Sequence, residues 1–151
     1  MRLAEALKLR SDLNARLAEL GTRLNSNAKV QEGEVPSEDP EDLLAELDAV
    51  MGQLERLVTR INLTNSATRA SDGRTLTELI ARRDLLIRRS EILRAFLNEA
   101  SSLVNRYSSA EIRIHSTVDV RELRKQVDAV AEEARRTDVT IQELNWTTDL
   151  I

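Results

Sequence analysis

A group of small polar residues beside an arginine, between two apolar stretches, could bind a small ligand. Residues 61–69 read INLTNSATR, and Asn62 and Asn65 lie three residues apart, on one face of a helix. Arginine carries a planar fork of N–H donors that suits carboxylate or phosphate. We therefore expect a polar inter-helix site in which Arg69 and Arg83 hold a small anion and amides orient it. The candidate binding residues are Asn62, Asn65, Arg69, Arg83, Asp84 and Asn145. The patch at 61–69 is equally compatible with a hydrogen-bonded bundle end.

No pattern in the sequence predicts catalysis. His115 is the sole histidine, so the Glu-x-x-His pairs of a di-metal bundle are absent, and no serine lies in a glycine elbow. The four glycines form no phosphate-binding loop, and cysteine is absent. The acids between residues 32 and 42 lack EF-hand spacing, and those at 38–42 suit a helix N-terminus, whose dipole favours negative charge. We expect no catalytic residue, no metal and no cofactor.

The elements that would position such a site are long helices. Apolar residues recur at intervals of three and four over 3–25, 40–69, 75–101 and 120–145, which is the spacing of helices packed through one seam. Asp39 followed by proline, and the pairs Thr75/Glu78 and Asp119/Glu122, predict helix starts. Residues 28–39 form an acidic loop that we expect to be mobile. Alternation near 110–117 predicts a short extended or β segment.

The fold class that follows is all-α: an antiparallel bundle of four long helices in a single domain, residues 1–151. Polar residues interrupt the predicted seams, and a buried polar group without a partner costs about 1–3 kcal/mol. These residues therefore serve register and oligomeric state, line a pocket, or reach water at helix ends. They are Arg10, Asn65, Arg83, Ser90 and Thr137.

The charge of the chain is unevenly distributed. The net charge is −4, residues 32–46 contain acids without Lys or Arg, and arginines dominate residues 74–94. Opposite patches could meet inside one assembly, or the arginines could hold an anion. We expect no nucleic-acid partner because the net charge is negative and aromatics are few. No apolar run approaches the roughly 20 residues of a membrane span, and the first residues lack a signal-peptide core. The expected location is the cytoplasm.

Several strings together resemble a small uncharacterised bacterial family of long-helix proteins, some of which are labelled septicolysin. The strings lie at 27–34, 61–65, 74–76, 81–84, 116–120 and 141–146. The resemblance implies a homo-oligomer, plausibly a hexamer, without assigned catalytic residues. The septicolysin label implies a pore-forming protein.

The function expected from the sequence is that of a self-assembling helical protein, a structural or interaction module without catalysis of its own. The first alternative is a small-ligand or anion-binding protein, or an enzyme, with the polar inter-helix site described above. The second alternative is a septicolysin-like membrane-active protein.

Overall fold

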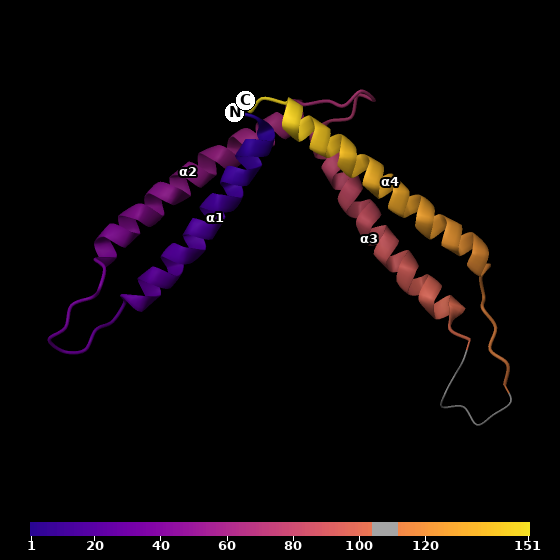
Figure 1. Cartoon of the computed structure of the whole chain (residues 1–151), viewed down its shortest axis with the longest axis horizontal. Helices are drawn as coiled ribbons and strands as arrows, with labels where there is room; N and C mark the ends of the chain where they lie inside the picture. The colour runs from indigo at the N-terminus through magenta and orange to yellow at the C-terminus, as the bar shows by residue number, and fades with distance from the viewer. Residues whose placement is uncertain (104–111) are drawn as a thin grey trace. The chain divides into compact units, whose positions relative to one another are not determined.

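The computed structural model describes residues 1–103 and 112–151 and is all-α, as predicted. Its helices are α1 (Leu3–Ser26), α2 (Pro40–Ala67), α3 (Leu76–Ser101) and α4 (Val120–Thr147) (Figure 1). Each predicted helix is present, and its ends differ from the expected ones by two residues or fewer. Helix ends are set by local hydrogen bonds, and the capping residues that make these bonds can be recognised in the sequence.

The helix starts show why the boundaries were predictable. The Asp39 side chain accepts a hydrogen bond from the Glu41 backbone N–H, at 2.9 Å, and proline occupies the first position of α2. Thr75 and Glu78 form a reciprocal capping box at α3. Asp119 accepts hydrogen bonds from two backbone N–H groups at the start of α4. These side chains satisfy backbone donors that a helix leaves without partners in its first turn.

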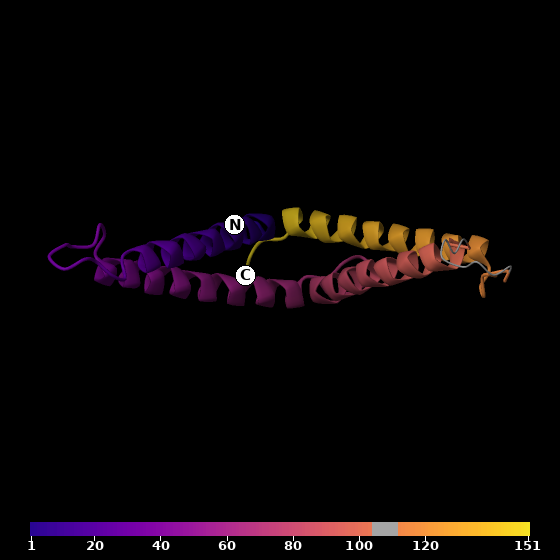
Figure 2. The ribbon, with the colours of Figure 1, turned by 90° about the horizontal axis from the view of Figure 1, so that it is seen from below.

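The chain groups into two compact units. Unit 1 comprises Met1–Arg69 and Glu143–Ile151, and unit 2 comprises Ala70–Gln142, so the boundary falls within α4. In unit 1, α1 runs beside α2, and in unit 2, α3 runs beside α4 (Figures 1 and 2). The single domain expected from the sequence stays a prediction.

The core of unit 1 lies along the facing sides of α1 and α2. Helix α2 carries two apolar stripes, one with Leu43, Val50 and Leu57 and one with Leu44 and Met51. The structure buries the stripe of Leu43, Val50, Leu57 and Thr64. It leaves Leu44 and Met51, from the other stripe, 50% and 52% exposed. The side of α2 that carries Leu44 and Met51 is therefore an apolar surface of unit 1. From α1, the core takes Leu3, Ala6, Leu13 and Leu20.

The core of unit 2 lies between α3 and α4. Leu86 packs with Val130 and Ala134, and half-buried Leu93 lies against this cluster. Two of the predicted polar interruptions, Ser90 and Thr137, are buried in this unit. The Thr137 hydroxyl donates a hydrogen bond to the Glu133 backbone carbonyl, at 2.9 Å. A turn of helix thus satisfies this polar group without a ligand. Arg10, by contrast, is exposed on α1.

The segment before α4 forms no β-ladder in the described part of the chain. Residues 112–116 have no regular secondary structure, and His115 is exposed. The remainder of the predicted extended segment, 110 and 111, lies outside the described residues. A single short segment cannot form a sheet without a partner strand, so alternation alone was an insufficient signal.

The two units repeat one helical pattern. Asp39 caps α2 and Asp119 caps α4, 80 residues further on, and α1 corresponds to α3 with an offset of 73. Buried core residues fall at equivalent positions of the two hairpins. The pairs are Leu3/Leu76, Ala6/Leu79, Leu13/Leu86, Leu43/Leu123, Val50/Val130 and Ile61/Ile141. One hairpin pattern therefore occurs twice, and positions where the copies differ are not imposed by the shared core.

Candidate functional site

The six predicted binding residues fall into both units. Asn62, Asn65 and Arg69, at the end of α2, belong to unit 1, as does Asn145 near the end of α4. Arg83 and Asp84 lie on α3 in unit 2.

Arg83 is held by two carboxylates of its own unit. Its guanidinium donates to Asp84 at 2.8 Å and to Asp138 at 3.1 Å. Partial burial lowers the pKa of Arg83, but the hydrogen bonds to Asp84 and Asp138 outweigh that effect and raise it. The guanidinium fork is thus already engaged with anions, and an external anion would have to compete with both.

The polar end of α2 uses a threonine, where sequence reasoning had selected asparagines. Asn62 is exposed and Asn65 is half-buried, while Thr64 is fully buried. The Thr64 hydroxyl donates to the Arg60 carbonyl at 2.8 Å and accepts from the Ile151 N–H at 3.0 Å. Asn145 is also buried. This end of unit 1 is therefore a hydrogen-bonded attachment for the chain's last residues.

The two chain ends pair beside this attachment, a feature that sequence reasoning missed. Arg2 and Asp149 form an antiparallel bridge flanked by two backbone hydrogen bonds of 2.9 Å, from Leu3 to Thr148 and from Leu150 to Met1. An ion pair of 3.1 Å also joins the Arg2 and Asp149 side chains. In Figure 1 the labels N and C accordingly lie side by side. The repeat offered a signal for this pairing of the chain ends. Position 149 corresponds to Arg69, so the last residues of the chain align with the connection between α2 and α3.

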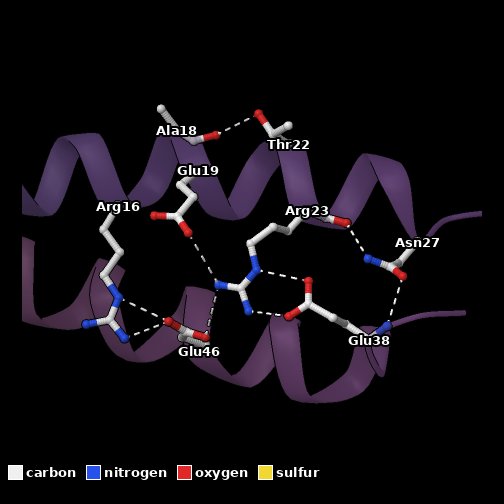
Figure 3. Close-up of polar contacts among 8 residues, drawn as sticks. All are labelled: Arg16, Ala18, Glu19, Thr22, Arg23, Asn27, Glu38 and Glu46. Atoms are coloured by element: carbon white, nitrogen blue, oxygen red, sulfur yellow. Dashed lines mark hydrogen bonds and ion pairs between the residues drawn. The ribbon is translucent and has the colours of Figure 1, made fainter.

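Charged side chains join α1 to α2 near their connecting loop (Figure 3). Arg23 binds both carboxylate oxygens of Glu38, at 3.0 and 2.5 Å, and Arg16 binds Glu46. Asn27, 8% exposed, donates to the Arg23 carbonyl and accepts from the Glu38 N–H. The hydrogen bond from Arg23 is the main reason why the pKa of Glu38 is lowered. We call Arg23, Asn27, Glu38 and Glu46 the loop clasp.

Hollows lie next to polar residues in both units. One, of about 450 Å³, is formed by residues on both arms of the loop between α1 and α2, including Lys29 and Glu34. Another, of about 250 Å³ in unit 2, lies between the turn at 70–74 and α4, and Arg74 and Arg136 line it. Arg74 is paired with Asp72 at 2.6 Å, which lowers the pKa of that carboxyl. In the described ranges, no three His, Cys, Asp or Glu side chains gather as metal ligands.

The outer face of α3 carries apolar residues that unit 2 leaves largely or partly exposed, although Phe96 also lines a hollow with residues 114–117. Leu85, Ile92 and Phe96 are 68%, 61% and 45% exposed. They recur at intervals of seven and four, so they form one stripe along the helix. We call these three residues the α3 stripe. The equivalent positions of α1 hold Asp12, Glu19 and Arg23.

The fold and these surfaces define an all-α protein built from a repeated helical hairpin. The chain belongs to a family of unknown function (DUF6847), which matches residues 10–150. It is also similar to a functionally unknown conserved protein from Corynebacterium diphtheriae, for which a crystal structure has been solved. The two are 42% identical, over 100% of this chain and 99% of that one, with a TM-score of 0.90. No curated protein gave a significant match. The expected membership of an uncharacterised family is thus confirmed.

Among the described residues, no helix is both long and apolar enough to cross a membrane.

Proposed function

We propose that the protein is a non-catalytic helical module that assembles with copies of itself through the α3 stripe. The observation that carries the proposal is the difference between the two hairpins. Their cores match, yet α3 presents Leu85, Ile92 and Phe96 where α1 presents charged residues. The shared core of the hairpins does not require apolar residues on the outer face of α3. The stripe therefore serves something other than the packing of the hairpin. Contiguous exposed apolar patches typically mark interaction sites.

The energetics favour covering this stripe. Fully burying a Leu, Ile or Phe side chain contributes about 1.5–3 kcal/mol. Three such residues that are 45–68% exposed can therefore supply several kcal/mol, which offsets part of the entropy lost on association. The resemblance described above adds the finer expectation of a hexamer. The cytoplasmic location expected from the sequence is also part of this proposal.

The test is the mass of the particle in solution. Light scattering after size exclusion, at micromolar concentration, should give a multiple of 17.0 kDa. The variant Leu85→Glu/Ile92→Glu should shift the mass to that of one chain, because it places charge in the stripe. Val139→Glu is the matched control, since Val139 is 57% exposed on α4 in the same unit. A wild-type particle of one chain would exclude the proposal.

A second candidate is the binding of a small anion, favoured by the hollow of unit 2 beside Arg74 and Arg136. Arg69 and Arg83, the predicted anion holders, are part of this alternative, although the carboxylates on Arg83 count against it. Phosphate should raise the melting temperature if the hollow binds it, and Arg136→Ala should abolish the rise. A calorimetric titration without heat would reject this candidate.

The septicolysin label supplies a third candidate, membrane activity. It predicts dye release from liposomes by the wild-type chain at one or more pH values. Liposomes that stay sealed throughout would reject it.

A further inference from the structure

We infer that the α3 stripe of one copy docks on the outer face of α2 in a second copy. This inference rests on the proposed self-assembly and names its partner surface. The first support is a second exposed apolar stripe. Leu44 and Met51 are half-exposed on α2, and Leu47, Leu54 and Val58 beside them are only partly buried. We call these five residues the α2 stripe.

The α2 stripe is also specific to its own hairpin. The positions of α4 equivalent to Leu44, Met51 and Val58 hold Arg124, Ala131 and Asp138. The shared core therefore does not require apolar residues on this outer face. The chain carries two outer apolar stripes, on α2 and α3. Their most exposed members have polar or small counterparts on α4 and α1, whereas the half-buried Leu47 and Leu54 correspond to the buried Val127 and Ala134.

The charges beside the α2 stripe are negative. Glu41, Asp48 and Glu55 follow one another at intervals of seven residues, so they form a row about 10.5 Å apart along one side of the helix. All three are exposed, and their carboxylates have no hydrogen-bond or ion-pair partner among residues 1–103 and 112–151. At the equivalent positions, α4 carries Arg121, Asp128 and Arg135, so the uniform row is a property of α2.

The charges beside the middle of the α3 stripe are positive, whereas Glu78 and Glu99 lie at its two ends, seven residues before Leu85 and seven after Ile92. Arg88 and Arg89 flank it between Leu85 and Ile92, and neither has an ion-pair partner in the described ranges. Their neighbours on the same helix behave differently, because Arg82 pairs with Glu133 and Arg83 pairs with Asp84 and Asp138. Unit 2 thus neutralises the arginines that face α4 and leaves those beside the stripe available.

The two surfaces complement one another in both polarity and charge. Apolar residues along the centre with opposite charges at the flanks are the arrangement by which helices choose partners in coiled coils. Each copy carries both surfaces, so a copy can offer its α3 stripe and its α2 stripe to other copies. The same contact can also repeat around a ring. A second copy of this chain therefore satisfies both surfaces without another protein.

Charge reversal tests the pairing. Arg88→Glu/Arg89→Glu makes both surfaces acidic, and Asp48→Lys/Glu55→Lys makes both basic. Each variant alone should assemble about tenfold more weakly or worse, because like charges then meet. Mixing the two variants should restore the assembly, since each acidic surface then finds a basic one. Arg121→Glu/Arg124→Glu on α4 is the control with the same change in net charge as Arg88→Glu/Arg89→Glu, and it should assemble like the wild type.

A cysteine cross-link provides a test without any change in charge. The chain contains no cysteine, so Ile92→Cys and Met51→Cys each introduce a single thiol. A mixture of the two, oxidised in air with a copper catalyst, should give a disulfide-linked pair of chains. Val139→Cys mixed with Met51→Cys should give little.

The outcomes separate the inference from the function on which it rests. If the wild type assembles but the mixture of charge variants stays dissociated and no cross-link forms, the pairing of α3 with α2 is wrong, although self-assembly stands. If the wild type is a single chain at every concentration, both fail. Circular dichroism at 222 nm should confirm that each variant keeps its helices.

Discussion

Unit 1 and unit 2 share a hairpin pattern but close the loop end of that hairpin with different chemistry. Unit 1 uses the loop clasp of Arg23, Asn27, Glu38 and Glu46 (Figure 3). The equivalent positions of unit 2 hold Phe96, Ala100, Val118 and Gln126. A buried apolar seam thus tolerates either a charged or an apolar neighbour at its end. The difference shows that the core specifies the hairpin, whereas the residues outside the core distinguish the units.

The largest effect should come from the core, where the two units are alike. Ile61→Ala and Ile141→Ala remove equivalent, almost fully buried side chains, and each should lower the free energy of unfolding by about 2–5 kcal/mol. Urea unfolding followed by circular dichroism measures both. Leu63→Ala, at an exposed position of α2, should cost much less. A loss confined to one of the two isoleucines would break the equivalence of the hairpins.

The loop clasp should come next. Asn27→Ala leaves the Glu38 N–H without its acceptor, and it should cost about 1–3 kcal/mol of unfolding free energy. The exposed Asn25 provides the matched control, because Asn25→Ala deletes an amide that makes no such bridge. Equal losses in the same urea experiment would mean that the amide of Asn27 contributes nothing special.

The clasp should also make unit 1 sensitive to acid. The pKa of Glu38 lies below its ordinary value of 4.5, mainly because Arg23 donates hydrogen bonds to its carboxylate. The stabilisation is therefore complete above pH 4.5 and disappears as the pH falls through the lower, folded-state pKa. Melting curves of wild type and Glu38→Gln should differ at pH 7 and converge at lower pH. Curves that stay parallel down to pH 2 would contradict this expectation.

The smallest effect should come from the paired chain ends. Asp149→Asn removes an ion pair with Arg2 whose side chains are 48% and 72% exposed, so it should cost less than about 1 kcal/mol. The backbone bridge remains in this variant. Thr64→Val, which removes the acceptor of the Ile151 N–H, should cost more than Asp149→Asn. The reverse order would show that the surface charges, and not the hydrogen-bonded attachment, hold the tail.

The repeat itself was within reach of the sequence. Aligning 39–65 with 119–145 places Asp39, Leu43, Asp48, Val50, Ile61 and Asn65 opposite identical residues. The apolar spacing alone obscures this relation, because any two long amphipathic helices share it. The candidate site was harder to predict. Periodicity places Arg83 on a seam, but only the structure supplies Asp138, 55 residues away, as its partner.

The sequence by itself determined the all-α class and the four helix boundaries, because capping residues and apolar spacing act within a few residues of the chain. Tertiary structure decided which of the two apolar faces of α2 is buried. It also decided how the chain ends pair and that Arg83 is held by carboxylates. These outcomes depend on which surfaces meet across long separations in sequence. A helix with two apolar faces can bury either one, and the pairing of α1 with α2 buries Val50 and Leu57 and leaves Leu44 and Met51 half-exposed.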